Sequence, residues 1–188
     1  MCGVKKMDDM KVKVENMVSA ITIDQKINLA EFSSTATGVR YNPKNFPGVV
    51  YRIKNPAVAM LIFSSGKVIC TGARSKKDIE DAAQNLIEKF KESNIIIKSK
   101  PKIEVQNIVA SAKLDFEVNL DLLAMECENT EYEPEQFPGL VFRLADPKTV
   151  MLIFRSGKMI ITGARSLKDV KMAAIRTREM FEEFNAAI

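Results

Sequence analysis

The sequence predicts an α+β fold built from two copies of one unit, with one curved antiparallel sheet and long helices on one of its faces. Twelve of the fifteen Gly and Pro residues fall in register after a shift of 91 positions. Residues 14–90 align with 105–181 without a gap, at about 33 identities in 77 positions. We therefore expect a first repeat at 11–100 and a second at 101–188, fused into one unit about a pseudo-twofold axis.

Each copy is predicted to begin with a strand, over 11–23 in the first and 103–114 in the second. A short segment of mixed polarity follows, at 28–36 and 119–127, and is long enough for one or two helices. The connections to the strands that come next are short, which favours antiparallel pairing.

Three shorter strands and a helix complete each copy. In the first copy the strands span 49–54 after Phe-Pro-Gly, 57–64 after Asn-Pro and 67–71 after Ser-Gly, a tight hairpin reversal. The final helix has apolar residues at three- and four-residue spacing, typical of one buried stripe. The stripe is Ile79, Ala82, Ala83, Leu86, Ile87 and Phe90 in the first copy, and Val170, Ala173, Ala174, Thr177, Phe181 and Phe184 in the second.

The strands carry more apolar surface than these helices can cover. A sheet with one solvated face should alternate apolar and polar residues, but both alternating sets of 59–63 are apolar. Met60 and Ile62 suit the helix side, which leaves Leu61 and Phe63 for the second face. Such a face needs a partner. Its expected members are Asn16, Val18, Ala20, Leu61, Phe63, Ile69 and Thr71, and then Asn107, Val109, Leu152, Phe154, Ile160 and Thr162.

Cations surround this uncharged set at matched positions. They are Arg52, Lys67 and Arg74, and again Arg143, Lys158 and Arg165. The DNA minor groove has a complementary form, because phosphates line its walls and its floor presents sugars and base acceptors. A homodimer, or a sheet with a second covering layer, is the alternative.

The charge of the chain is unevenly divided. The net charge is +4, but residues 1–100 hold 17 basic and 10 acidic residues, a net of +7. Residues 101–188 hold 11 and 14, a net of −3. This division suggests one surface for DNA and another for a protein.

The composition excludes several enzyme classes. There is no His, so Ser-His-Asp and Cys-His nucleophiles and His-containing zinc sites are ruled out. Cys2, Cys70 and Cys127 lie far apart and form no disulfide framework or zinc knuckle. Ser-Gly-Lys lacks the other residues of a phosphate loop. We expect a soluble intracellular protein without catalytic activity, cofactor or metal, with no signal peptide and no membrane span.

The repeated motifs resemble those of the TATA-box-binding protein family. Each copy contains Asn-x-Val, Tyr-x-Pro-x-x-Phe-Pro-Gly, Met-Leu-Ile-Phe-x-Ser-Gly-Lys and Thr-Gly-Ala-Arg, and the resemblance runs from Val14 to Phe184. It implies a saddle whose concave sheet covers the minor groove of the TATA element. It also implies a general transcription initiation factor that recruits transcription factor B and RNA polymerase. The short segment before the first repeat resembles archaeal members, which implies a cytoplasmic, nucleoid-associated protein; a eukaryotic member would be nuclear.

The resemblance assigns roles to individual residues. Members of this family are the standard example of apolar side chains wedged into the minor groove to kink DNA. The matching wedges are Phe46 and Phe63 in one repeat and Phe137 and Phe154 in the other. The matching floor residues are Asn16, Val18, Leu61, Ile69, Thr71, Asn107, Val109, Leu152, Ile160 and Thr162. The matching phosphate contacts are Arg52, Ser65, Lys67, Arg74, Arg143, Ser156, Lys158 and Arg165.

An acidic loop before the second Phe-Pro-Gly turn matches the stirrup that transcription factor B contacts in this family. Its matching residues are Glu133, Glu135 and Gln136; a solvated acidic loop is the alternative. Gln106 matches a residue that the family often uses near the DNA backbone. Its equivalent, Glu15, is left out of the site because a carboxylate would repel phosphate. Three other possibilities stay open: a nucleic-acid-binding accessory domain of the same fold, an apolar-ligand or self-association module, and a homodimer off DNA.

Overall fold

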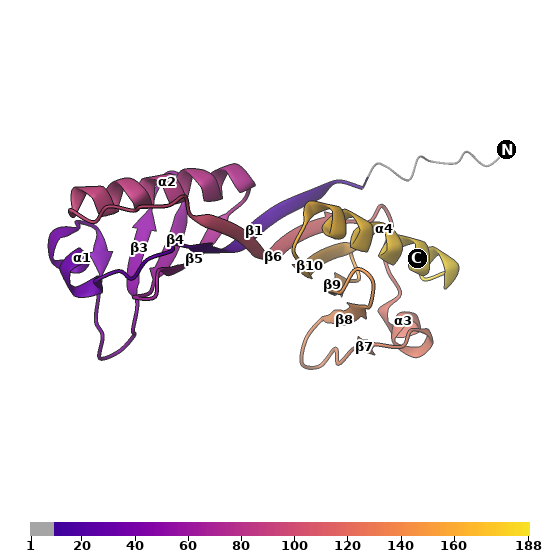
Figure 1. Ribbon diagram of the computed structural model, residues 1–188. Helices are drawn as coiled ribbons and strands as arrows, with labels where there is room; N and C mark the ends of the chain where they lie inside the picture. Colours follow the sequence, from indigo (N-terminus) through magenta and orange to yellow (C-terminus); the bar gives the residue numbers. More distant parts are fainter. Residues whose placement is uncertain (1–9) are drawn as a thin grey trace. The chain divides into compact units, whose positions relative to one another are not determined.

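The computed structural model describes residues 10–188, which contain ten strands and four helices (Figure 1). The elements of the first repeat are β1 (Val12–Thr22), α1 (Leu29–Thr35), β2 (Val39–Arg40), β3 (Val49–Ile53), β4 (Val58–Ile62), β5 (Lys67–Ala73) and α2 (Lys76–Glu92). Those of the second are β6 (Lys102–Lys113), α3 (Leu120–Glu126), β7 (Thr130–Glu131), β8 (Gly139–Leu144), β9 (Thr149–Phe154), β10 (Lys158–Ala164) and α4 (Leu167–Glu183). The same seven elements therefore recur in the same order.

The strands form one ten-stranded sheet, and the α+β class and the repeat are confirmed. In the first repeat the order is β2-β3-β4-β5-β1, and in the second it is β6-β10-β9-β8-β7. The described residues divide into two compact units, Asn16–Gln106 and a second formed by residues 10–15 with Asn107–Ile188. Unit boundaries therefore fall within β1 and β6.

The helices begin where the sequence supplies side chains for their free N–H groups. Asn28 accepts a hydrogen bond from the Glu31 N–H at 3.2 Å, and Asn119 accepts one from Leu122 at 3.1 Å. Each of these polar-apolar segments forms a single seven-residue helix. At the start of α2, Ser75 and Asp78 form a reciprocal capping box.

The capping carboxylate of α2 is held in its ionised form. The Arg74 N–H donates a hydrogen bond to Asp78 at 2.8 Å, and the pKa of Asp78 is consequently lowered. The ionised carboxylate at the N-terminus of the helix also complements the helix dipole.

Each long helix covers one face of its half of the sheet, and Figure 1 shows α2 lying along β3 to β5. The predicted stripe of α2 is buried at Ile79, Leu86 and Phe90, and the Phe90 ring meets Phe32 of α1 with centroids 4.7 Å apart. In α4, Thr177 replaces the leucine of the first copy. Its hydroxyl is buried and donates to the Ala173 carbonyl oxygen at 2.8 Å, so a polar group is accommodated in the core.

The remaining predictions concern elements that sequence periodicity describes poorly. The two-residue strands β2 and β7 were not predicted, since a pair of residues carries no periodicity.

Cys70 and Cys127 are free and buried, while Cys2 and the N-terminal residues used to exclude a signal peptide lie outside the described range. No helix within residues 10–188 is long and apolar enough to cross a lipid bilayer.

Candidate nucleic-acid interface

The sheet face away from the long helices is partly open in both units. In β4, Met60 and Ile62 are fully buried on the helix side, whereas Leu61 between them is only half-buried. The strands β1, β5, β6, β9 and β10 alternate in the same way. The predicted floor residues are all half-buried, as expected for members of this second face: Asn16, Val18, Leu61, Ile69 and Thr71, with Asn107, Val109, Leu152, Ile160 and Thr162.

Strand register joins the apolar floor residues into rows across the sheet. In the first unit Leu61 lies opposite Val50 on one side and Ile69 on the other. In the second, Leu152 lies between Val141 and Ile160. The two valines belong to the same face and were missed by the sequence argument. The alternation of β3 and β8 could have identified both valines. Each valine lies two residues before a predicted phosphate contact and therefore points to the same face of its strand.

A β-bulge fixes the polar centre of each floor. The register of β1 and β5 shifts between Met17 and Ser19, and Gly72 adopts a positive φ of 101° there. The Gly72 N–H donates to Asn16 Oδ1 at 2.7 Å, and Asn16 Nδ2 donates to Thr71 Oγ1 at 3.3 Å. The amide oxygen is therefore turned toward the protein, and the amide NH2 toward the threonine hydroxyl.

The second unit repeats this arrangement closely. The Gly163 N–H donates to Asn107 Oδ1 at 2.7 Å, and Asn107 Nδ2 donates to Thr162 Oγ1 at 3.2 Å. The register shift again falls beside the pair, between Ile161 and Ala164. Each floor thus carries, among apolar neighbours, one amide that a backbone N–H orients and one hydroxyl beside it.

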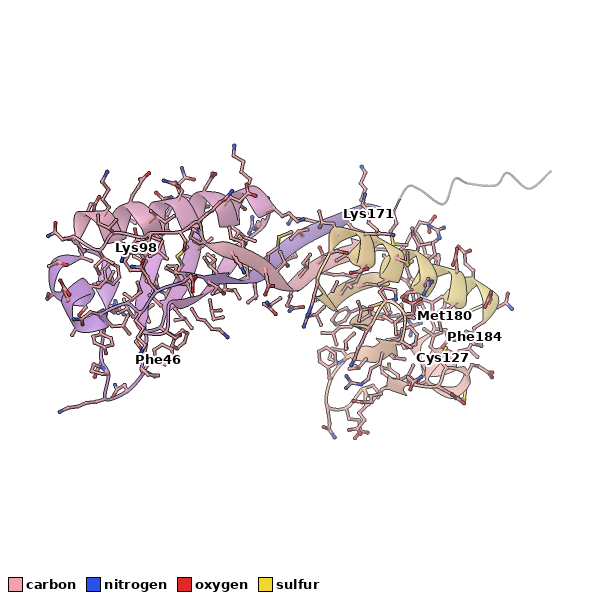
Figure 2. All side chains as sticks on the ribbon, in the orientation of Figure 1. Phe46, Lys98, Cys127, Lys171, Met180 and Phe184 are labelled. Atoms are coloured by element: carbon pink, nitrogen blue, oxygen red, sulfur yellow. The ribbon has the colours of Figure 1, made fainter. Side chains whose placement is uncertain are left out.

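The four predicted wedge residues form two pairs, one in each unit. The rings of Phe46 and Phe63 meet edge to face with centroids 5.8 Å apart, and Phe137 and Phe154 meet at the same distance. All four are at least partly exposed; Phe137 is 39% exposed. Phe46 lies on the side of the sheet away from α2 (Figure 2).

A glycine beneath each pair lets the rings lie against the backbone. A Cβ at Gly139 would lie 2.7 Å from the Phe137 ring and 3.1 Å from the Phe154 ring. At Gly48 it would lie 2.8 Å from the Phe46 ring. The Phe-Pro-Gly motif therefore has a steric reason: the third residue must have no side chain for the ring of the first to occupy its place.

The predicted phosphate contacts are exposed, and one of them is engaged within the protein. Arg52, Lys67, Arg74, Arg143, Lys158 and Arg165 are all exposed, as are Ser65 and Ser156. Arg143 forms an ion pair with Glu131 at 3.2 Å. Within residues 10–188 the other five cations form no ion pair. Ser65 also accepts a hydrogen bond from the Lys67 N–H at 3.4 Å in the hairpin turn.

The loops before the two Phe-Pro-Gly turns share a backbone geometry and differ in charge. The Glu133 carbonyl oxygen accepts hydrogen bonds from the N–H groups of Gln136 and Phe137, both at 2.9 Å. Asn42 accepts the equivalent pair from Asn45 and Phe46 at 3.0 Å. Glu133, Glu135 and Gln136 are exposed. The second loop therefore offers two carboxylates and an amide on a defined turn.

Glu15, which sequence reasoning left out of the site, is compensated within the protein. Its Oε1 accepts a hydrogen bond from Ser111 Oγ at 2.7 Å and lies 3.3 Å from Lys13 Nζ. The carboxylate is thus satisfied by a hydroxyl and a cation from its own unit, which reduces the repulsion that it would exert on a phosphate.

Comparison with known proteins agrees with this geometry. The family model described as "Transcription factor TFIID (or TATA-binding protein, TBP)" matches residues 11–93 and 102–184. TATA-box-binding proteins from Methanobrevibacter smithii and Archaeoglobus fulgidus are 45% and 46% identical to the chain. The matches cover 95% of this chain and 99% of the first relative, and 92% and 96% for the second. The solved structure "Methanococcus jannaschii TBP" matches with a TM-score of 0.87 and 47% identity, over 92% of this chain and 99% of that one.

Proposed function

The chain belongs to the TATA-binding protein family of DNA-binding transcription factors, and we propose that it is a general initiation factor that binds the minor groove of the TATA element. The observation that carries the proposal is the open floor of each unit. This floor combines a row of apolar side chains with one Asn and Thr pair of fixed orientation.

The chemistry of the floor matches A·T base pairs. In the minor groove these pairs present only acceptors, adenine N3 and thymine O2, whereas guanine adds an amino group. The hydrogen bond from Gly72 directs the Asn16 oxygen inward, so the amide NH2 and the Thr71 hydroxyl are the groups that meet acceptors. The apolar side chains exclude the guanine amino group, which would lose its hydrogen bonds there.

The exposed ring pairs supply a means of kinking the DNA. An apolar ring inserted between base pairs replaces part of the stacking that a kink removes. We propose that Phe46 with Phe63 and Phe137 with Phe154 insert at opposite ends of the element. The glycine beneath each pair leaves the space that the rings occupy, because a Cβ there would collide with them.

Backbone contacts hold the protein on the duplex. The cations Arg52, Lys67 and Arg74, with their second-repeat equivalents, are placed to meet phosphates, and Ser65 and Ser156 to donate hydroxyl hydrogen bonds. Such contacts fix position without reading sequence. Val18 in β1 and Val109 in β6 each belong to the floor of their own unit.

The acidic loop is proposed to recruit transcription factor B and, through it, RNA polymerase. Glu133, Glu135 and Gln136 form an exposed anionic turn, whereas the matched turn of the first repeat carries Asn42 and Lys44. Capture of a basic partner on one side only would give the bound complex a direction.

Off DNA, the open floor is proposed to pair with a second copy. The archaeal relatives favour a place on the nucleoid in the cytoplasm.

A gel-shift comparison of a TATA duplex with a G·C-rich duplex of equal length tests the proposal. The expected result is retention of the TATA duplex alone at moderate salt. Phosphate contacts are the same in both duplexes, so the difference in retention comes from the bases that meet the floor. Equal retention of the two duplexes would contradict minor-groove recognition. Binding of neither, with self-association in sedimentation, would favour the apolar self-association module.

A further inference from the structure

The outer edges of the two floors carry different charges at structurally equivalent positions. In the second unit Glu131 of β7 lies opposite Val141 of β8, and Arg143 lies two residues further along β8. Residues related in this way are diagonal neighbours on one face of a sheet, within reach of long side chains. Glu131 Oε1 accordingly accepts hydrogen bonds from Arg143 Nη2 at 3.2 Å and from Arg143 Nε at 3.4 Å.

The first unit has the same diagonal with two cations. Arg40 of β2 lies opposite Val50 of β3, and Arg52 lies two residues further along. Both arginines are exposed, and neither forms an ion pair within the described residues 10–188. Because Val50 and Val141 belong to the floor rows, both diagonals lie on the proposed DNA face.

A carboxylate and a phosphate compete for the same guanidinium donors. Arg143 must break its bonds to Glu131, or share them, before it binds a phosphate, and Glu131 also repels that phosphate. At the first-unit edge an anion meets two unpaired guanidinium groups. We propose that Glu131 weakens phosphate binding by Arg143, that Arg40 adds a phosphate contact beside Arg52, and that the first repeat therefore holds DNA more tightly than the second.

This inference rests on the proposed function. It adds that the two repeats bind the phosphates at the two ends of the element with unequal strength. Direction on the DNA would then be set partly by the protein alone, before any acidic-loop partner binds. Sequence suggested a difference in total charge between the halves. In the structure, part of this charge difference lies on the proposed DNA face, at Glu131 and Arg40.

The first test removes the competing carboxylate. Glu131→Gln is compared with Glu128→Gln, which makes the same change in net charge three residues away, at an exposed position without an ion pair among the described residues. Dissociation constants for a TATA duplex are measured from about 50 to about 300 mM salt. Glu131→Gln should tighten binding roughly threefold to tenfold at low salt and steepen the slope of log K against log salt by up to about 0.9. Equal effects of the two substitutions would show that only the net charge of the protein changes its affinity for DNA, and would overturn the proposal.

The second test transfers the pair to the first repeat. Arg40→Glu recreates the Glu131 diagonal beside Arg52, and Lys91→Glu makes the same charge change on the outer end of α2. Arg40→Glu should weaken TATA binding by about tenfold or more and flatten the salt slope by about one to two, as one or two phosphate contacts are lost. Lys91→Glu should change both values much less. A Lys91→Glu effect as large as that of Arg40→Glu would refute the special position of Arg40.

The two proposals fail in different ways. If the unsubstituted protein does not prefer the TATA duplex, the proposed function fails and the variants need not be compared. If it does, but Glu131→Gln has no effect beyond Glu128→Gln, only the inference about Glu131 fails. Because the Glu131–Arg143 pair is largely exposed, its removal should leave the thermal unfolding midpoint unchanged, and that midpoint is recorded for every variant.

Discussion

The side-chain oxygen of Asn16 accepts a hydrogen bond from the backbone N–H of Gly72 at 2.7 Å. The bond lies at the β-bulge, and it fixes the orientation of the amide, whose NH2 group then faces Thr71. Asn107 and Gly163 repeat the bond at the same length in the other unit. A structural role and the proposed recognition role therefore fall on one side chain, and they can be separated by substitution.

Replacing Asn16 with Asp should separate stability from DNA binding. Asp keeps an oxygen for the Gly72 N–H and an acceptor for the Thr71 hydroxyl, so the bulge should form. It removes the NH2 donor and places a negative charge among minor-groove acceptors, so TATA affinity should fall at least tenfold, a loss of about 1.4 kcal/mol or more. Denaturant unfolding and fluorescence-anisotropy binding check the two parts. Loss of folding with Asn16→Asp would contradict this division of roles, and Asn107→Asp provides the matched repeat.

Replacing the ring of Phe154 with Ala should reduce DNA bending more than protein stability. Phe154 is half-buried, so the loss of stability should be less than about 2 kcal/mol. Phe32→Ala, at a fully buried ring, should cost about 3–5 kcal/mol and serves as the contrast. Bending is measured by fluorescence transfer between dyes at the ends of the duplex, for Phe154→Ala and Phe63→Ala. Unchanged transfer in a bound complex would argue against insertion.

Adding a methyl group at Gly139 should displace the ring pair above it. The new Cβ would meet the Phe137 ring at 2.7 Å and the Phe154 ring at 3.1 Å, and its nearest neighbours are these side chains. Gly139→Ala should therefore weaken TATA binding and bending while the fold persists. Gly38→Ala is the control. The φ of 78° at Gly38 makes Ala unfavourable by about 1 kcal/mol, but beyond the adjoining residues no atom lies within 4 Å of the position of the new Cβ. Gly38→Ala should lower stability and leave bending intact.

Charge reversal in the acidic loop should abolish partner recruitment alone. The double substitution Glu133→Arg and Glu135→Arg changes exposed side chains whose backbone turn is held by main-chain hydrogen bonds. TATA binding should persist, whereas the ternary complex with transcription factor B should be lost in a supershift assay. An undiminished supershift would show that this loop is not the docking site.

Cys70 should make the protein less stable at alkaline pH. Burial raises the pKa of its thiol from 9.0 to about 11, so the folded state keeps the proton after the unfolded state has lost it. The stability contributed by the neutral thiol is present below about pH 9 and is lost as the pH rises from about 9 to about 11, by at most roughly 2–3 kcal/mol. Urea unfolding at about pH 8 and about pH 10.5 should show the cost of Cys70→Ala shrinking as the pH rises. A cost that stays constant would mean that the thiol ionises equally in both states.

The sequence predicted the features that arise from short-range periodicity. The apolar stripe of α2 and the alternation around Leu61 follow from the fixed geometry of helices and strands, so the core and the open face could be assigned from residue spacing. The helix starts at Asn28 and Ser75 also carry a local signal that the sequence prediction did not use, because the side chain that satisfies a free N–H stands close to it in the chain. The repeated Phe-Pro-Gly, Ser-Gly-Lys and Thr-Gly-Ala-Arg motifs then placed the candidate site residues by resemblance.

By itself, then, the sequence determined the repeat, the two faces of the sheet and the residue types of the proposed ligand-binding face. Only the tertiary structure decided which of these side chains are already engaged. Asn16 with Gly72, Arg143 with Glu131 and Glu15 with Ser111 are separated by 56, 12 and 96 residues. Such pairs depend on strand register and on a bulge, which a one-residue shift would change and which local spacing does not record. The sequence specifies the residue types, but the orientation of Asn16 and the competition of Glu131 for Arg143 depend on the register of the sheet.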